Sequence, residues 1–147
     1  MPRVIDGDNL LGTWPGRSRS DAEKRALVRE IDGLMRREKR RVVVVFDGSP
    51  PPGVSYGSDV FFSGQGRKAD AVILELLRRE RDPRGWTVVT NDRSLADQCH
   101  FVGAKVEPVR LFRERLARDA SGEKPEASGD IDYWLDQFGG DDPSSPP

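Results

Sequence analysis

Cysteine and histidine are scarce in this sequence, which has one of each, Cys99 and His100, among 147 residues. A single cysteine excludes an intrachain disulfide, and a single histidine leaves no cluster of imidazoles to bind zinc. No run of apolar residues approaches the roughly 20 that a membrane-spanning helix needs. The chain also starts without the basic and apolar segments of a secretory signal, so we expect a cytoplasmic protein with no membrane segment.

An excess of charge of one sign is also missing, because 24 Lys and Arg residues stand against 25 Asp and Glu residues. The net charge of −1 therefore indicates no class of partner. Its distribution is uneven: residues 17–41 hold ten basic and five acidic side chains, whereas residues 119–147 hold one basic and eight acidic ones. The length suits one domain, which we place at residues 1–118, followed by an acidic tail at 119–147.

The tail is rich in Gly, Ser, Pro and acidic residues, and its end, residues 139–147, is predicted to have no ordered structure. Three aromatic residues, Tyr133, Trp134 and Phe138, interrupt this composition at approximately helical spacing. They predict a short helix at 131–138, which either docks on the domain and covers its core or binds a partner.

Strand and helix signals alternate along the domain. Short apolar runs rich in β-branched residues predict strands, and apolar residues at helical spacing predict the helices between them. The strands are expected at 3–6, 42–46, 59–63, 86–90 and 105–107, and the helices at 20–41, 69–81, 93–100 and 108–118. This order predicts an α/β fold, a three-layer sandwich with a mainly parallel sheet.

Aspartates stand where these elements change. Asp6, Asp47 and Asp92 stand at the ends of three predicted strands, and Asp70 stands at the start of a helix. Each one alone has a structural explanation as a turn, a helix cap or a partner of a helix dipole. Together they favour a shared site, because ligands of open parallel sheets bind outside the carboxyl ends of the strands. Two carboxylates about 4 Å apart repel by roughly 4 kcal/mol at an effective dielectric constant of about 20, so such a site needs a cation.

The kind of cation follows from the ligands. Carboxylate oxygens without thiolates or imidazoles favour Mg²⁺ or Mn²⁺. Mg²⁺ usually keeps water molecules and substrate phosphates as its remaining ligands, so a phosphate ester is the implied substrate. The cation would acidify the attacking water and neutralise charge on the phosphate oxygens. The sequence leaves the number of metal ions open.

Four segments resemble the successive motifs of NYN domains, the PIN-like ribonucleases, and most closely their bacterial YacP-like branch. These segments are Ile5–Asn9, Val45–Gly48, Lys68–Ile73 and Val89–Arg93. They occur in the family's order and span nearly the whole predicted domain. The resemblance implies a PIN-like fold and a metal-dependent endoribonuclease that cleaves RNA phosphodiester bonds. RNA is then the expected partner, and the ribosome is a further candidate partner.

The resemblance also implies roles for individual residues. Asp6, Asp70 and Asp92 match the acidic metal site of the family, and Asp47 lies close to it. Asn9 matches the asparagine of the first motif and completes the expected catalytic set. It is expected to position the phosphate or the attacking water.

A second group of residues flanks the same edge and is predicted to hold the RNA, with the basic members binding its backbone by charge. These residues are Arg67, Lys68, Arg93 and Ser94. The chain departs from the family at two positions. It has Asp8 where an aromatic residue is common, and Asn91 where a serine often precedes the last aspartate. Asp8 would either add a metal ligand or repel substrate.

Three other interpretations compete with this one. A haloacid-dehalogenase-like phosphatase also starts with a strand ending in Asp-x-Asp, as Asp6 and Asp8 do, but its lysine follows the threonine motif, whereas Lys68 precedes Thr90. A phosphorylatable receiver domain would need an additional strand between Asp8 and Asp47, where only one helix is expected. A catalytically silent NYN domain that binds RNA or acts as an adaptor is the third alternative.

Overall fold

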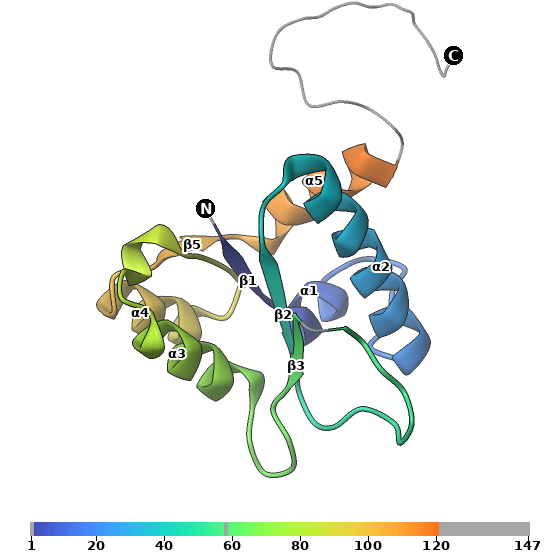
Figure 1. The fold of residues 1–147 in the computed structure, drawn as a ribbon, viewed down its shortest axis with the longest axis horizontal. Helices are drawn as coiled ribbons and strands as arrows, with labels where there is room; N and C mark the ends of the chain where they lie inside the picture. The colour runs from blue at the N-terminus through green and yellow to red at the C-terminus, as the bar shows by residue number, and fades with distance from the viewer. Residues whose placement is uncertain (1, 58, 121–147) are drawn as a thin grey trace, which may run out of the picture. The chain divides into compact units, whose positions relative to one another are not determined.

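The computed structural model describes residues 2–57 and 59–120, and it contains a five-stranded sheet whose neighbouring strands are all parallel (Figure 1). The strand order is β3-β2-β1-β4-β5. The strands are β1 (Arg3–Asp6), β2 (Val42–Phe46), β3 (Val60–Phe62), β4 (Thr87–Val89) and β5 (Lys105–Glu107). The helices are α1 (Gly7–Gly12), α2 (Asp21–Glu38), α3 (Ala69–Arg79), α4 (Arg93–Phe101) and α5 (Val109–Ala120), with a 3-10 turn η1 (Pro83–Gly85).

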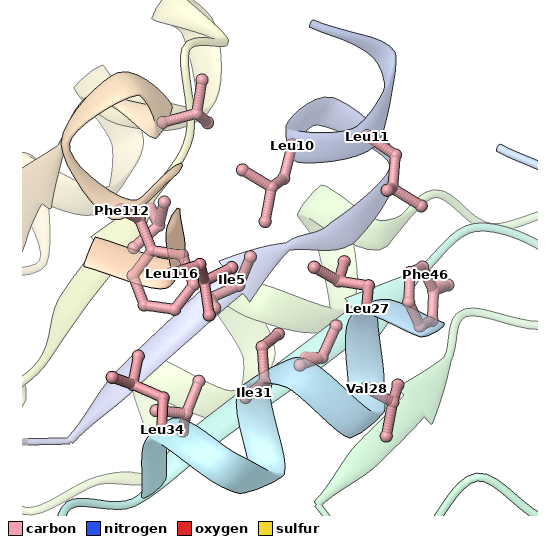
Figure 2. Close-up of a cluster of buried hydrophobic side chains, with 14 residues drawn as sticks. Ile5, Leu10, Leu11, Leu27, Val28, Ile31, Leu34, Phe46, Phe112 and Leu116 are labelled. Atoms are coloured by element: carbon pink, nitrogen blue, oxygen red, sulfur yellow. The ribbon is translucent and has the colours of Figure 1, made fainter. Parts of the chain in front are cut away.

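Side chains of the strands alternate between two cores, one on each face of the sheet. In β2, Val42, Val44 and Phe46 join the core formed with α1, α2 and α5, which is drawn in Figure 2. Val43 and Val45 join the core formed with α3 and α4. Because helices cover both faces, every position of β2 is buried and apolar, as expected for a central parallel strand. The predicted three-layer α/β sandwich is confirmed.

Helix α2 shows how local sequence sets the boundaries of an element. It begins after Ser20, whose hydroxyl accepts a hydrogen bond from the backbone N–H of Glu23 at 3.2 Å. It ends at Glu38, because Lys39 adopts the left-handed conformation with φ of 54°. The predicted end at residue 41 is therefore wrong by three residues. The chain has to leave the helix at this point in order to enter β2.

The expectation of a single helix between the first two strands is wrong, because α1 precedes α2 there. The six residues of α1 are too few to show a helical period in the sequence. Asp6 caps it, accepting a hydrogen bond from the backbone N–H of Asn9 at 3.4 Å. A Cβ on Gly7 would lie 2.6 Å from Cδ1 of Phe46, so glycine is what lets this helix start so close to β2. No additional strand occurs between β1 and β2, as a receiver domain would require.

The sheet has a topological switch point between β1 and β4. From β1 the chain passes through α1 and α2 on one face, and from β4 it passes through α4 on the other face. Ligands of open α/β sheets bind at such a point, outside the carboxyl ends of the strands. Asp6 ends β1 and Asp92 follows β4, so these two aspartates stand on either side of it.

Two further expectations concern membrane segments and the predicted tail. None of the described helices has the length and apolar character needed to cross a bilayer. The predicted helix at 131–138 and most of the predicted tail lie outside the described residues. The proposed boundary after residue 118 stays a prediction.

Candidate active site

An open cavity of about 390 Å³ lies at the carboxyl ends of the central strands. It is lined by residues from the end of β1, the start of α1, the loop before α2, the loop after β2, the loop between β3 and α3, the start of α3 and the loop after β4. Its lining residues are Asp6, Asp8, Asn9, Arg19, Asp47, Arg67, Lys68, Ala69, Asp70 and Asp92. We call it the acidic cavity. The four aspartates singled out in the sequence all lie in it.

Asp6 is the most buried of these four aspartates, with 9% of its surface exposed. Its Oδ1 accepts the backbone N–H of Asn9, and its Oδ2 accepts the hydroxyl of Thr90 at 3.3 Å. Burial raises the pKa of its carboxyl group from 3.8 to about 6, and the charges of Asp47 and Asp8 act in the same direction. The two hydrogen bonds lower this pKa but do not offset the burial. Asp6 is therefore easier to protonate than an aspartate in water, mainly because it is buried.

Thr90 connects the two aspartates on either side of the switch point. It is 2% exposed, and besides donating to Asp6 it accepts the backbone N–H of Asp92 at 3.0 Å. Asp92 caps α4, accepting the backbone N–H of Leu95 at 3.1 Å. From the sequence, Thr90 was expected to matter only in the competing interpretations. Its position directly after a buried strand and two residues before Asp92 was the available signal.

Asp47 and Asp70 meet at the start of α3. The Oδ1 of Asp47 accepts the backbone N–H of Ala69 at 2.6 Å, so this aspartate caps α3 from a distant part of the chain. Lys68, at the N-cap position itself, makes no such bond with its side chain. Asp70 accepts the backbone N–H of Ala71 at 2.8 Å. The loop after β2 and the first turn of α3 thus each present one carboxylate to the cavity, Asp47 and Asp70.

Asn9 and Asn91 form a second connection across the site. The Oδ1 of Asn9 accepts the backbone N–H of Asn91 at 2.8 Å, and the Oδ1 of Asn91 accepts the backbone N–H of Val109 at 3.1 Å. These bonds tie α1 to the loop after β4 and that loop to the start of α5. Asn91 therefore supports the loop that carries Asp92, a role the sequence alone did not reveal.

The predicted RNA-binding residues separate into two pairs. Arg67 and Lys68 line the acidic cavity, whereas Arg93 and Ser94 do not. Arg19, which the sequence analysis did not single out, contributes a third cation to the lining.

The loop that carries Arg67 and Lys68 is anchored by Ser63. This residue is 6% exposed, and its hydroxyl donates to the backbone carbonyl of Arg67 at 2.8 Å and accepts the backbone N–H of Gly48 at 3.0 Å. The loops after β2 and β3 are held together by these bonds.

The ligand atoms available in the cavity are carboxylate oxygens, which is the type of ligand that a hard cation prefers. Asp47, Asp70 and Asp92 each use one oxygen for a backbone N–H, and the other oxygen accepts no hydrogen bond from the residues that the structure describes. Oxygen-only ligands of this type suit Mg²⁺ or Mn²⁺. Within residues 2–57 and 59–120, however, no three His, Cys, Asp or Glu side chains are already arranged as a metal site. A cation would have to draw the free oxygens together.

A parallel sheet with acidic side chains gathered at its carboxyl edge is the arrangement expected of a PIN-like nuclease. The family model of the YacP-like NYN domain matches residues 3–131, and the chain belongs to this family of PIN-like nucleases. The resemblance inferred from the sequence motifs is confirmed. The family supports a ribonuclease-like function.

Two solved structures of Rae1 (YacP) from Bacillus subtilis share the fold. A W164L mutant superposes with a TM-score of 0.67 at 22% identity, covering 86% of this chain and 87% of that one. A second structure gives a TM-score of 0.64 at 22% identity, covering 83% of this chain and 78% of that one. No curated protein matched the sequence.

Proposed function

We propose that this protein is a divalent-metal-dependent endoribonuclease that cleaves phosphodiester bonds of RNA. The observation that supports this most strongly is the convergence of Asp6, Asp47, Asp70 and Asp92 on one open cavity, three of them with an oxygen free of hydrogen bonds from the described residues. A solvent-accessible group of carboxylates suits a cation and a phosphate ester better than it suits an apolar ligand.

Mg²⁺ or Mn²⁺ bound here would supply the chemistry of an acidified water and of charge neutralisation on the phosphate. Asp6, Asp47, Asp70 and Asp92 would hold the ion. Asn9 keeps its side-chain oxygen on the backbone of Asn91, which leaves its amide nitrogen to donate to a phosphate oxygen.

The RNA backbone would lie between the cations of two loops. Arg19 stands before α2, and Arg67 and Lys68 stand before α3, so the acidic cavity has basic groups contributed by both. Contacts of this kind neutralise phosphates without reading bases, which predicts binding that is largely independent of sequence. Arg93 and Ser94 would contact RNA only outside the cavity. The ribosome as a partner and the cytoplasm as the location stay predictions.

The test is cleavage of single-stranded RNA in the presence and absence of Mn²⁺, comparing the wild type with Asp6→Asn, Asp70→Asn and Asp92→Asn. Asparagine caps helices about as well as aspartate, so these variants should keep their fold while losing a charged ligand. We expect each to lose most of the metal-dependent cleavage. Asp97→Asn, on the same helix as Asp92 but outside the cavity, is the matched control and should stay active.

A second candidate is an RNA-binding NYN domain without cleavage activity. It is favoured by the lack of a ready-made metal arrangement among the described side chains. The same samples distinguish the two: RNA binding that withstands all three substitutions, with no cleavage by the wild type in Mn²⁺, would support the silent domain and contradict our proposal.

A further inference from the structure

Asp8 is a fifth carboxylate in the acidic cavity, and both of its oxygens are already engaged. Its Oδ2 accepts the backbone N–H of Asp47 at 2.5 Å, and its Oδ1 lies 3.7 Å from the ammonium nitrogen of Lys24. This engagement distinguishes Asp8 from Asp47, Asp70 and Asp92, which each have an oxygen without such a bond from the described residues.

Lys24 is unusually enclosed for a lysine. Its side chain is 12% exposed and that of Asp8 is 9% exposed. The ammonium nitrogen also lies 5.4 Å from the ring centroid of Phe46 and 5.8 Å from that of Phe62, within reach of cation–π attraction. A charge so far removed from water is costly unless it is paired, so the position of Lys24 is tied to that of Asp8.

The pair acts on the site through Asp47. The backbone of Asp47 is held by Asp8, and its side chain in turn holds the backbone of Ala69 at the start of α3. A continuous series of contacts thus runs from Lys24 in α2, through Asp8 in α1, to the loop after β2 and on to the helix that carries Asp70. Asp47 itself is exposed, and Asp8 provides the acceptor for its backbone N–H.

We propose that Lys24 and Asp8 are positioning residues, which fix Asp47 and the start of α3 and so set the spacing of the carboxylates. In this role Asp8 is not a metal ligand, and Lys24 neutralises it. The role of the pair in metal binding rests on the proposed function, whereas the anchoring of Asp47 does not depend on it. Groups that orient metal ligands in this way typically change metal affinity 10- to 100-fold when they are removed.

Two double variants separate the hydrogen bond from the charge. Asp8→Asn with Lys24→Met removes both charges but keeps an oxygen that can accept the N–H of Asp47. Asp8→Leu with Lys24→Met removes both charges and the acceptor, at similar side-chain volume. The two proteins therefore differ in the acceptor that the proposal requires and in the polarity of the side chain at position 8. Should the leucine variant not fold, Asp8→Ala with Lys24→Met makes the same comparison.

Three measurements are made on each full-length protein: Mn²⁺ affinity by calorimetric titration, Mn²⁺-dependent RNA cleavage, and hydrogen exchange of the Asp47 amide by NMR. We expect the asparagine variant to stay within about threefold of the wild type in metal affinity and cleavage, with the Asp47 amide protected. We expect the leucine variant to bind Mn²⁺ at least roughly tenfold more weakly, with that amide exchanging freely.

The other outcomes would overturn the proposal. Equal losses in both variants would show that the charges of the pair, and not the acceptor at position 8, determine the metal affinity. Unchanged affinity in both would show that the pair does not influence the metal site. If even the wild type bound no Mn²⁺, the proposed function and the pair's role in metal binding would fail together. Amide exchange at Asp47 would still decide whether Asp8 anchors it.

Discussion

Three aspartates of the acidic cavity, Asp6, Asp47 and Asp92, have a structural task as well as a proposed chemical one. Asp6 caps α1, Asp92 caps α4 and Asp47 caps α3 from the neighbouring loop. A cap contributes about 1 kcal/mol, which is less than the repulsion between close carboxylates. Capping alone therefore does not account for placing these charges together. Asparagine would cap equally well without the repulsion.

Asp6 makes the stability of the metal-free protein depend on pH. Its pKa is raised from 3.8 to about 6, so the folded protein binds more protons than the unfolded chain between these values, and its stability falls as the pH rises through this window. We expect Asp6→Asn to be more stable than the wild type by up to about 3 kcal/mol at pH 7, and equally stable near pH 4. Urea unfolding of both proteins across this range, without divalent metal, is the measurement. A difference in unfolding free energy that stayed constant with pH would show that it does not come from the raised pKa of Asp6.

At the scale of residues, sequence reasoning found the charged groups but not the neutral ones that hold them. Asp6, Asp47, Asp70 and Asp92 could be found because acidic residues at strand ends are conspicuous. Thr90 was missed, because a threonine directly after a strand is ordinary and its hydrogen bond to Asp6 exists only once β1 and β4 are paired. Lys24 was hidden for a similar reason: its partner Asp8 lies on another helix.

Helix α1 is the element on which the site depends most closely, since it carries Asp8 and Asn9 and is capped by Asp6. We expect Gly7→Ala to destabilise the fold by about 1–3 kcal/mol, because the added Cβ would overlap with the ring of Phe46. Gly12→Ala is the matched control in the same helix. Its Cβ would meet only the side chain of Arg19, at 3.7 Å, so it should be neutral or stabilising. Urea unfolding of the two variants tests this, and similar losses would contradict it.

The loop between β3 and α3 is expected to bind RNA without binding metal. Arg67→Glu with Lys68→Glu should weaken RNA binding and flatten the dependence of log affinity on log salt by roughly 1.4, at about 0.7 per lost phosphate contact. Mn²⁺ affinity should change little. The control with the same change of charge is Arg78→Glu with Arg81→Glu. Arg78 lies in the last turn of α3 and Arg81 lies just after the helix, and neither residue lines the acidic cavity. Filter binding at several salt concentrations measures the slope, and an unchanged slope would place the RNA path elsewhere.

At the scale of elements, the strands and the longer helices could be predicted because their patterns are long enough to read. The strand 42–46 and the strand 105–107 have the predicted bounds. Helix α1 and the turn η1 were missed, since six and three residues carry no period. The end of α2 was misplaced because the backbone at Lys39 adopts a left-handed conformation that the residue type does not announce.

For the molecule as a whole, a cation in the acidic cavity should stabilise the folded state. Binding at a hundredfold excess over the dissociation constant contributes about 2.7 kcal/mol, which corresponds to roughly 10 °C in melting temperature. We expect Mn²⁺ to raise the melting temperature of the wild type and of Asp97→Asn, and to raise that of Asp70→Asn much less. Scanning calorimetry with and without the ion gives the answer. A shift of equal size in all three proteins would locate the ion outside the cavity.

The class of the fold was predictable because alternating strand and helix patterns admit few arrangements, and parallel neighbours follow from the helical crossovers. The order of the strands was not. It depends on which strand β4 pairs with, and the sequence of β4 is equally apolar whichever neighbour it has. The structure places it beside β1 at the switch point, with Val4 opposite Val88, and the pairing of Asp6 with Thr90 follows from that choice.

The central position of β1 has a consequence for the order in which the protein can assemble. β1 comes first in the chain among the strands of this sheet, and it is hydrogen-bonded on one side to β2 and on the other to β4, more than eighty residues later. A chain that stops before β4 contains Asp6, Asp47 and Asp70 but has neither Thr90 nor Asp92. Growing or truncated chains would therefore lack one wall of the acidic cavity. The cavity would be complete only after β4 has paired with β1.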